Sequence, residues 1–204
     1  KNFYTVNNKN RIITNKFSRG RVHIMRSNHD CIVTSSKTII KDDSRLTCRI
    51  KGLEKYSPTR IIFDNKLKIP IKSIIVNEAD NYPTYVFYNK MNKKKISLLK
   101  RKSIKTFSIP LNDYGDLNIE KALIKIKSLG FSRVFLEAGT KLTSSFLDKN
   151  LVDDLIIFIS DKNIYGRDCK GNLKKYLNKL LKNKKGKVEK VNLFGDKLIS
   201  YNLK

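Results

Sequence analysis

The chain has 204 residues and a formal net charge of +26, from 44 Lys and Arg against 18 Asp and Glu. This length suits one well-packed domain and is short for two. The apolar runs are of strand length and are interrupted by charge, so we expect neither a membrane-spanning helix nor a signal peptide.

Strands and helices alternate along the chain, which predicts an α/β fold made of one domain, with an antiparallel hairpin at its C-terminal end. The expected strands are 10–14, 30–34, 59–63, 74–76, 84–88, 103–108, 133–136 and 154–159. The expected helices are 16–28, 37–41, 118–129 and 172–182, with a further helix that starts near Thr140. The basic segment 90–102 is expected to pack weakly on the outside, and 187–193 with 197–203 to form the hairpin around Gly195–Asp196.

The stretch from Arg133 to Ser160 organises the fold. A short apolar run ends at Glu137, and Ala138–Gly139 form a turn in which glycine lets the backbone approach a ligand closely. Thr140 can cap the following helix, and the almost wholly apolar run 154–159 predicts a strand that is central in its sheet. Open α/β sheets bind ligands beyond the carboxyl ends of their strands. Glu137 at such an end is either solvated or directed at a polar ligand, and the spacing leaves both interpretations open.

Two polar segments outside this stretch are candidates for binding. Arg19 and Arg26 are seven residues apart and share one face of the predicted helix, where they are either solvated or able to hold a phosphate. Asp42 and Asp43 lie in a loop that also carries arginines, and turn formation through Asx hydrogen bonds is their simpler interpretation.

The charge, the cysteines and the histidines point to no further site. The lysines are spread over nearly every polar segment without a nucleic-acid-binding motif, so we expect no nucleic-acid partner. The three cysteines, Cys31, Cys48 and Cys169, contain no C-x-x-C pair. Together with His23 and His29 they do not have the spacing of metal ligands, so we expect no metal site. We expect His23 to be an ordinary residue of its predicted helix. Scattered cysteines suit a reducing cytoplasm. The absence of G-x-G-x-x-G, P-loop, zinc-deaminase and G-x-S-x-G motifs argues against those classes.

Three segments, in order and at matching separations, resemble a known family. They are CIVTSSKTIIKDDSRLTCR (31–49), TRIIFDNKLKIP (59–70) and VFLEAGTKLTSSFLDKNLVDDLIIFIS (134–160). They are similar to the reductase half of the bacterial bifunctional deaminase–reductase of riboflavin biosynthesis. The resemblance implies a dihydrofolate-reductase-like mixed sheet flanked by helices, and reduction by NADPH of 5-amino-6-(5-phosphoribosylamino)uracil at ribose C1′ of its ring-opened form.

The resemblance also assigns site residues. For the cofactor it implies Ile12, Thr38, Asp42, Asn65, Gly139, Thr140, Lys141, Leu142, Thr143, Ser144 and Ser145. For the substrate it implies Asn10, Arg26, Leu46, Arg49 and Glu137. Arg26 and Arg49 suit the 5′-phosphate, and Lys66 beside Asn65 is our own addition as a group that distinguishes a 2′-phosphate. No catalytic acid is identified, and Asp42 is a candidate for positioning only.

The family's first reductase strand, with its S-L-D-G-like turn, has no counterpart in this sequence, and we expect that strand and a deaminase domain to lie outside it. A cytoplasmic homodimer is expected from the resemblance. Two other functions stay open. One is a related reductase that acts on the diaminopyrimidinone before deamination, and the other is a non-catalytic basic domain that binds nucleic acid on a degenerate reductase scaffold.

Overall fold

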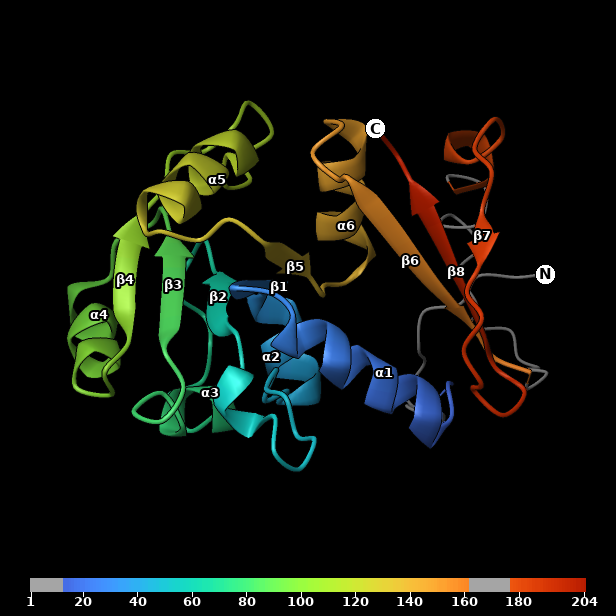
Figure 1. Cartoon of the computed structure of the whole chain (residues 1–204). Helices are drawn as coiled ribbons and strands as arrows, with labels where there is room; N and C mark the ends of the chain where they lie inside the picture. The colour runs from blue at the N-terminus through green and yellow to red at the C-terminus, as the bar shows by residue number, and fades with distance from the viewer. Residues whose placement is uncertain (1–12, 162–176) are drawn as a thin grey trace. The chain divides into compact units, whose positions relative to one another are not determined.

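The computed structural model describes residues 13–161 and 177–204 (Figure 1). These residues divide into two compact units, one formed by His23–Thr143 and the other by residues 13–22, 144–161 and 177–204. The helices are α1 Lys16–Ser27, α2 Ser36–Asp42, the 3₁₀ helix Glu54–Tyr56, α3 Ile74–Asn77, α4 Lys93–Lys100, α5 Ile119–Ser128 and α6 Thr140–Asp148. The strands are β1 Cys31–Ser35, β2 Thr59–Phe63, β3 Thr84–Tyr88, β4 Lys105–Ser108, β5 Val134–Leu136, β6 Asp154–Ile159, β7 Lys187–Val188 and β8 Lys197–Asn202.

The unit His23–Thr143 contains a parallel sheet with the strand order β4-β3-β2-β1-β5 (Figure 1). Cys31 of β1 pairs with Thr59 of β2 on one side and with Val134 of β5 on the other. The predicted bounds of β2 and β3 are confirmed residue for residue. Strands buried on both faces form continuous apolar runs that are easily recognised, and helical crossovers between them make the pairing parallel.

One face of this sheet is covered by α2, α3 and α4. Ile39 of α2, Ile75 of α3 and Leu99 of α4 belong to one buried cluster with Ile32 of β1 and Ile62 of β2. The expectation that the basic segment 90–102 packs weakly on the outside is therefore wrong. Lys93, Lys94 and Lys100 are exposed, but Lys95 donates to the Ile69 carbonyl and Leu99 has no exposed surface. A helix with one apolar stripe buries that stripe whatever its net charge.

The opposite face carries a row of aromatic residues covered by α5. Phe63, Phe87 and Phe107 are neighbours in register across β2, β3 and β4, with ring centroids 5.7 Å and 5.9 Å apart. Lys125 of α5 places its Nζ 4.5 Å from the centroid of the Phe107 ring. The predicted helix 118–129 is confirmed as α5, and the Asn118 side chain caps it by accepting the Lys121 N–H.

The order of the strands defines a switch point between β1 and β5. From β1 the chain adds β2, β3 and β4 on one side, and then returns to place β5 on the other side of β1. The crevice between the carboxyl ends of two strands that diverge in this way is where open α/β sheets bind ligands. The residues that follow β1 and β5 are therefore the first candidates for a ligand-binding site.

Residues 74–76 were predicted as a strand, and this prediction is wrong. They begin α3, whose first amide, Ile74 N–H, donates to Asp43 Oδ1 at 2.9 Å. Ile75 and Val76 are buried. A short apolar run buried on all sides carries no periodicity, so its conformation depends on tertiary contacts.

Arg60 is a buried charge near the amino end of β2, with no exposed surface. Its guanidinium donates to Thr84 Oγ1 and to backbone carbonyls that include those of Arg45, Ile75 and Tyr82. Burial lowers the pKa of Arg60 to about 10, so it stays charged at neutral pH. Through the hydrogen bond to the Arg45 carbonyl, the Arg60 guanidinium holds the loop that carries Arg45 against the sheet.

The second unit contains a three-stranded antiparallel sheet with the order β6-β8-β7. The predicted C-terminal hairpin is confirmed by the pairing of β7 with β8. The strand 154–159 is confirmed as β6, but within the described residues it lies at the edge of this sheet, and residues 154 and 156 are exposed. Its predicted central position is wrong, because an apolar run does not specify which neighbours a strand acquires.

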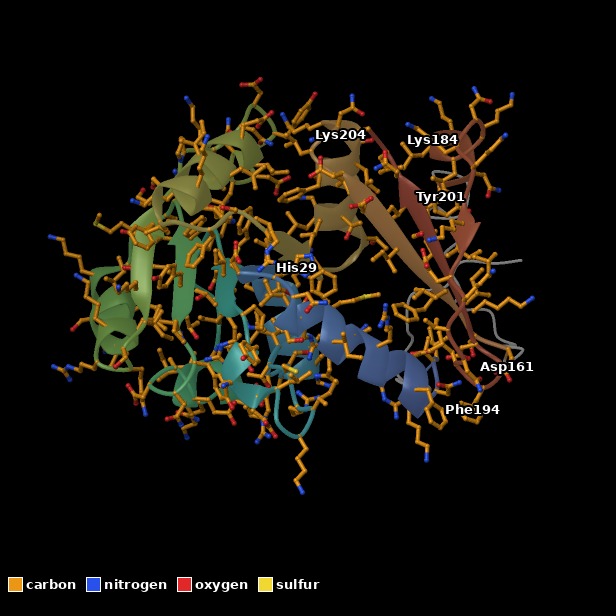
Figure 2. All side chains as sticks on the ribbon, viewed as in Figure 1. His29, Asp161, Lys184, Phe194, Tyr201 and Lys204 are labelled. Atoms are coloured by element: carbon orange, nitrogen blue, oxygen red, sulfur yellow. The ribbon has the colours of Figure 1, made fainter. Side chains whose placement is uncertain are left out.

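The turn before β8 is held by side chains of the same unit. Phe194 and Gly195 have φ of +50° and +102°, and the Phe194 ring stacks on Phe17 at 4.0 Å. A Cβ at Gly195 would lie 2.2 Å from an Asp161 carboxylate oxygen, which makes glycine necessary there (Figure 2). This turn is a structural feature of the antiparallel sheet.

Some predictions fall outside the described ranges. Most of the predicted strand 10–14 lies outside them, as does the first part of the predicted helix 172–182, of which residues 177–180 are helical. Within the described ranges no helix has the length and apolarity needed to cross a membrane.

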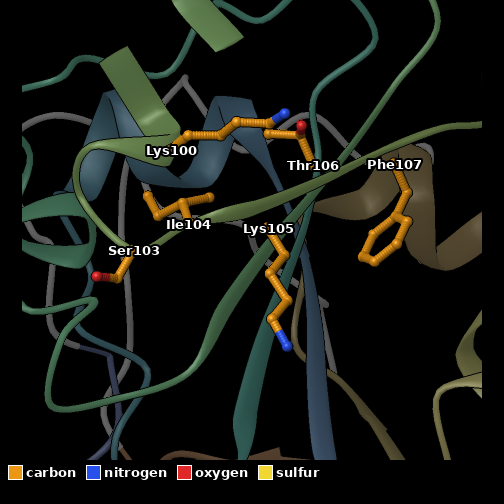
Figure 3. A pocket seen from close by; sticks show the side chains of 6 residues that line it. All are labelled: Lys100, Ser103, Ile104, Lys105, Thr106 and Phe107. Carbon is orange, nitrogen blue, oxygen red and sulfur yellow. The ribbon is translucent and has the colours of Figure 1, made fainter. Parts of the chain in front are cut away.

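An open hollow of about 580 Å³ lies along β4, three strands away from β1 (Figure 3). It is lined by Lys100, Ser103, Ile104, Lys105, Thr106 and Phe107. β4 is the edge strand of its sheet, and the lysine Lys105 on it is typical of an edge strand protected against pairing with another chain. We assign this hollow no role in binding.

Candidate functional site

The candidate site lies where β1 and β5 end. Val33 of β1 pairs with Leu136 of β5, and the next residue, Glu137, donates its backbone N–H to the Val33 carbonyl at 3.0 Å. At the end of β1, the hydroxyl of Ser35 is 3.3 Å from that of Thr38 in the first turn of α2. Polar groups from two neighbouring strand ends therefore border the switch point.

Arg26 forms a two-pronged ion pair with Glu137. Its Nε donates to Oε2 at 2.9 Å and its Nη2 to Oε1 at 2.7 Å, while Nη1 donates to the Thr47 carbonyl at 2.9 Å. The Arg26 side chain is 10% exposed and that of Glu137 34%. Of the five guanidinium N–H groups, three are used in these contacts, which leaves one on each terminal nitrogen for a ligand. The carboxylate is held in one orientation with its edge open to solvent.

The loop that follows α2 places Arg49 near this pair. Asp43 and Leu46 have φ of +43° and +58°, and Leu46 is buried. Asp43 accepts the Ile74 N–H at the start of α3, a tertiary contact and not the local Asx hydrogen bond of the simpler interpretation, whereas Asp42 is exposed at the end of α2. Non-glycine residues with positive φ are uncommon, and they cluster in loops whose shape is imposed by tertiary contacts.

Arg49 is exposed, and its guanidinium forms no hydrogen bond with the residues that the structure describes. Partial burial, and then the positive charges of Arg26 and Arg45, lower the pKa of Arg49 from its ordinary value. Arg45 differs, because its Nε contacts Glu78 Oε1 at 3.1 Å. The guanidinium groups of Arg26 and Arg49 therefore repel each other, and both have unused hydrogen-bond donors. Such a pair is suited to bind an anion such as a phosphate.

Replacing Arg49 with alanine is expected to raise the KM for a phosphorylated substrate about 10- to 100-fold with little change in kcat. The lost interaction is a charge-assisted hydrogen bond, worth about 1.5–3 kcal/mol, to a group remote from the reacting atom. Steady-state kinetics measure the effect. Arg45→Ala is the matched control, because it removes an arginine of the same loop that already has an acidic partner. Equal KM values for the two variants would remove Arg49 from the site.

His23 supports the same loop, which the sequence did not reveal. Its Nδ1 lies 3.0 Å from the Thr47 carbonyl and 3.2 Å from the Arg49 backbone nitrogen, which donates to it. Burial, and then the charges of Arg26 and Arg49, lower the pKa of His23. The neutral ring is therefore favoured in the folded protein. In the sequence, the one feature that indicated a link between His23 and the site was its position three residues before Arg26, on the same face of the predicted helix.

The lowered pKa of His23 predicts a pH-dependent stability. The unfolded chain, with an ordinary histidine pKa of about 6.5, binds this proton more readily than the folded protein. The stabilisation is therefore complete above about pH 6.5 and is lost as the pH falls below it, by up to about 1.4 kcal/mol per pH unit. Denaturant unfolding of the wild type and of His23→Gln between pH 5 and 8 measures the difference. Parallel stability profiles would contradict this role.

The turn after Glu137 leads into α6. Thr140, expected to cap the helix, is its first residue, and Gly139 precedes it. The Gly139 carbonyl accepts the Thr143 N–H at 3.2 Å, and Thr143 Oγ1 donates to the Ala138 carbonyl at 3.3 Å. A Cβ built on Gly139 meets no atom within 4 Å, and the residue is exposed. The space beside the turn is open, so a ligand can reach the first amides of α6.

A hairpin that precedes α5 contacts this region from the other side. The Asn65 side chain, just beyond β2, donates to the Gly115 carbonyl at 3.1 Å. Lys141, in the first turn of α6, is 2.8 Å from the Asp116 carboxylate. No residue type in 111–117 indicated a role in binding; the hairpin became recognisable only through these two contacts.

The described residues that were predicted for the site are thus brought together in part. The structure links Arg26 of α1 directly to Glu137, and the 111–117 hairpin contacts both Asn65 and Lys141. Thr38 lies near the start of α2, and Gly139, Thr140, Leu142 and Thr143 lie in or beside the first turn of α6. Asp42 is exposed at the other end of α2, and Leu46 and Arg49 lie in the loop that follows, with Leu46 buried. Ser144 and Ser145 lie in the second turn of α6 and belong to the other unit. Asn10 and Ile12 lie outside the described residues.

A parallel sheet with a switch point, an oriented carboxylate beside two arginines, and an open glycine turn are features of α/β domains that bind ligands at the carboxyl ends of their strands. Comparison with known families makes this specific. Residues 3–187 match the model of the RibD C-terminal domain, and the chain belongs to that family.

Curated relatives agree with this assignment. The chain is 32% identical over 158 residues to the riboflavin biosynthesis protein RibD of Aquifex aeolicus, covering 78% of this chain and 42% of that protein. It is also 32% identical over 172 residues to the 5-amino-6-(5-phosphoribosylamino)uracil reductase of Buchnera aphidicola, covering 80% of this chain and 81% of that protein. The chain thus spans less than half of the first protein and most of the second.

Solved structures show the same fold. RibD of Acinetobacter baumannii superposes with a TM-score of 0.75 at 18% identity, over 98% of this chain and 54% of that one. The riboflavin biosynthesis reductase of Saccharomyces cerevisiae superposes with a TM-score of 0.67 at 18% identity, over 93% and 82% of the two chains. The predicted dihydrofolate-reductase-like α/β class is confirmed, with one refinement: the parallel and antiparallel strands form two separate sheets in the described residues.

Proposed function

We propose that this chain is an NADPH-dependent reductase of riboflavin biosynthesis, which converts 5-amino-6-(5-phosphoribosylamino)uracil into its ribitylamino product. The observation that carries the proposal is the Arg26–Glu137 pair, held at the β1/β5 switch point with Arg49 nearby. Membership of the RibD C-terminal domain family and the name of the Buchnera relative support the reaction class.

The substrate half of the site would be Arg26, Arg49, Leu46 and Glu137, with Asn10 added by the family resemblance. The two remaining N–H groups of Arg26 and the guanidinium of Arg49 would bind the 5′-phosphate by charge-assisted hydrogen bonds. Glu137, fixed by Arg26, would accept hydrogen bonds from the substrate's N–H or O–H groups. The buried Leu46 would hold the loop in shape.

The cofactor half of the site would be the turn Gly139–Ser145 together with Thr38, Asp42 and Asn65, and with Ile12 from the resemblance. The open space at Gly139 fits this role, because a backbone without Cβ lets a pyrophosphate approach the first amides of α6. Asn65 and the exposed Lys66 would contact the 2′-phosphate. The cofactor supplies the hydride that is added at ribose C1′, and the protein's task is to orient the two ligands. Asp42, which is exposed, would help to position them.

A related substrate is the alternative within the same class. A relative from Methanothermobacter thermautotrophicus, 25% identical over 152 residues, is named 2,5-diamino-6-ribosylamino-4(3H)-pyrimidinone 5′-phosphate reductase. The two substrates differ only at C2 of the pyrimidine. Further proposals carried by the resemblance are a single reductase domain, a cytoplasmic homodimer and a deaminase domain linked to this chain in the full protein.

Calorimetric titration with NADPH and with NADH tests the proposal. We expect NADPH to bind at least about tenfold more tightly than NADH, which is about 1.4 kcal/mol. Turnover of both pyrimidine substrates would then identify the natural one. Absence of binding by either cofactor, with a steeply salt-dependent affinity for nucleic acid, would replace the reductase by a basic nucleic-acid-binding domain on the same scaffold.

A further inference from the structure

The hairpin between β4 and α5 is rigidly built. Leu111 and Leu117 form an antiparallel bridge, and the Asn112 N–H donates to the Asp116 carbonyl at 2.8 Å. The Asn112 side chain accepts the backbone N–H groups of Tyr114 and Asp116, each at 3.0 Å. Gly115 supplies the positive φ, +74°, that the turn requires. The position of the Tyr114 backbone is therefore well determined.

The two residues after Tyr114 connect the hairpin to the proposed cofactor site. Gly115 accepts the hydrogen bond from Asn65, and Asp116 pairs with Lys141. Asn65 lies at the end proposed for the 2′-phosphate, and Lys141 lies beside the turn proposed for the pyrophosphate. The hairpin thus borders the adenosine half of the cofactor site.

Tyr114 is 90% exposed, more than any other large hydrophobic residue exposed in the described ranges. Its side chain has no hydrogen-bond or ring partner among the described residues. In the described residues, the exposed rings of Phe17 and Phe194 differ from that of Tyr114, because they stack on each other. An aromatic ring on a rigid turn without a partner offers a flat apolar surface to a ligand.

We propose that Tyr114 stacks on the adenine ring of NADPH. The inference rests on the proposed function. Adenine is bonded to the same ribose that carries the 2′-phosphate, so a 2′-phosphate at Asn65 places the base within one ring's width of it. Asn65 contacts Gly115, and the Tyr114 and Gly115 Cα atoms are about 3.8 Å apart. Stacking of a base on an aromatic side chain contributes enough to change affinity about 5- to 150-fold.

The first test is a calorimetric titration with NADPH and with 2′,5′-ADP, which keeps the adenine, the 2′-phosphate and one phosphate of the pyrophosphate but lacks the nicotinamide half. Tyr114→Ala is expected to weaken both by about tenfold, and Tyr114→Phe to keep wild-type affinity. Tyr56→Ala, at a tyrosine that is 52% exposed, is the matched control and should change neither. Wild-type affinity in Tyr114→Ala, or an equal loss in Tyr114→Phe, overturns the stacking.

A second measurement uses the absence of tryptophan from the chain. Tyr114→Trp introduces a single fluorophore, whose emission 2′,5′-ADP should quench on stacking, whereas that of Tyr56→Trp should not change. Binding of 2′,5′-ADP without quenching overturns the proposal even if an alanine variant fails to fold. If the wild type binds neither NADPH nor 2′,5′-ADP, the proposed reductase function itself fails. If the wild type binds them and Tyr114→Ala binds them equally, the role of Tyr114 alone fails.

Discussion

Replacing Glu137 with glutamine is expected to lower kcat/KM about 100-fold and to leave the Kd for NADPH within about twofold of wild type. Glutamine keeps the shape of the side chain but turns one hydrogen-bond acceptor into a donor, which then opposes the Arg26 guanidinium. The variant therefore loses both the orientation of Glu137 and its ability to accept hydrogen bonds from the substrate. Loss of one charged hydrogen bond is worth about 1.5–3 kcal/mol, and disruption of the pair adds to it.

The kinetic effect has to be separated from a loss of stability. Arg26 is buried, and removing the charge of its partner is expected to lower the free energy of unfolding by about 1–2 kcal/mol, because Glu137 is partly exposed. Denaturant unfolding of each variant measures this. Glu78→Gln is the control, since it neutralises the partner of Arg45 in an ion pair of the same unit. A Glu137→Gln variant with unchanged turnover would exclude Glu137 from the substrate site.

Replacing Gly139 with valine is expected to weaken NADPH binding at least about 100-fold with little change in Tm. A Cβ at this position meets no atom of the protein within 4 Å, and the residue does not have a positive φ. The fold therefore tolerates the side chain. The added methyl groups would occupy the space through which a pyrophosphate has to reach the amides of α6.

A series of side chains of increasing size at position 139 makes the test of steric exclusion more specific. Gly139→Ala should bind NADPH with an intermediate affinity, because a single methyl group fills part of the space. Gly20→Ala, on α1, is the control, since its Cβ also meets nothing within 4 Å, at a position without a proposed ligand. Calorimetry gives the affinities and thermal unfolding the stabilities. Wild-type affinity in Gly139→Val would place the cofactor elsewhere.

The fold was predicted well where local pattern and tertiary environment agree. Thr59–Phe63 and Thr84–Tyr88 are continuous apolar runs flanked by polar turns, and both became strands with the predicted bounds. The prediction failed where the environment decides. Residues 74–76 formed α3, helped by the Asp43 carboxylate from a distant part of the chain, and 154–159 joined an antiparallel sheet.

In the candidate site, too, some features could be predicted from local sequence and others depended on tertiary contacts. The sequence alone determined which residue types stand at strand ends, namely Glu137, Gly139 and Asn65, because strand and turn signals are local. Only the tertiary structure decided their partners. Arg26 and Glu137 are 111 residues apart, and Asn65 and Gly115 are 50 apart. The physical reason is that such pairs depend on the order and register of the strands, which result from the packing of the whole sheet and from no single segment.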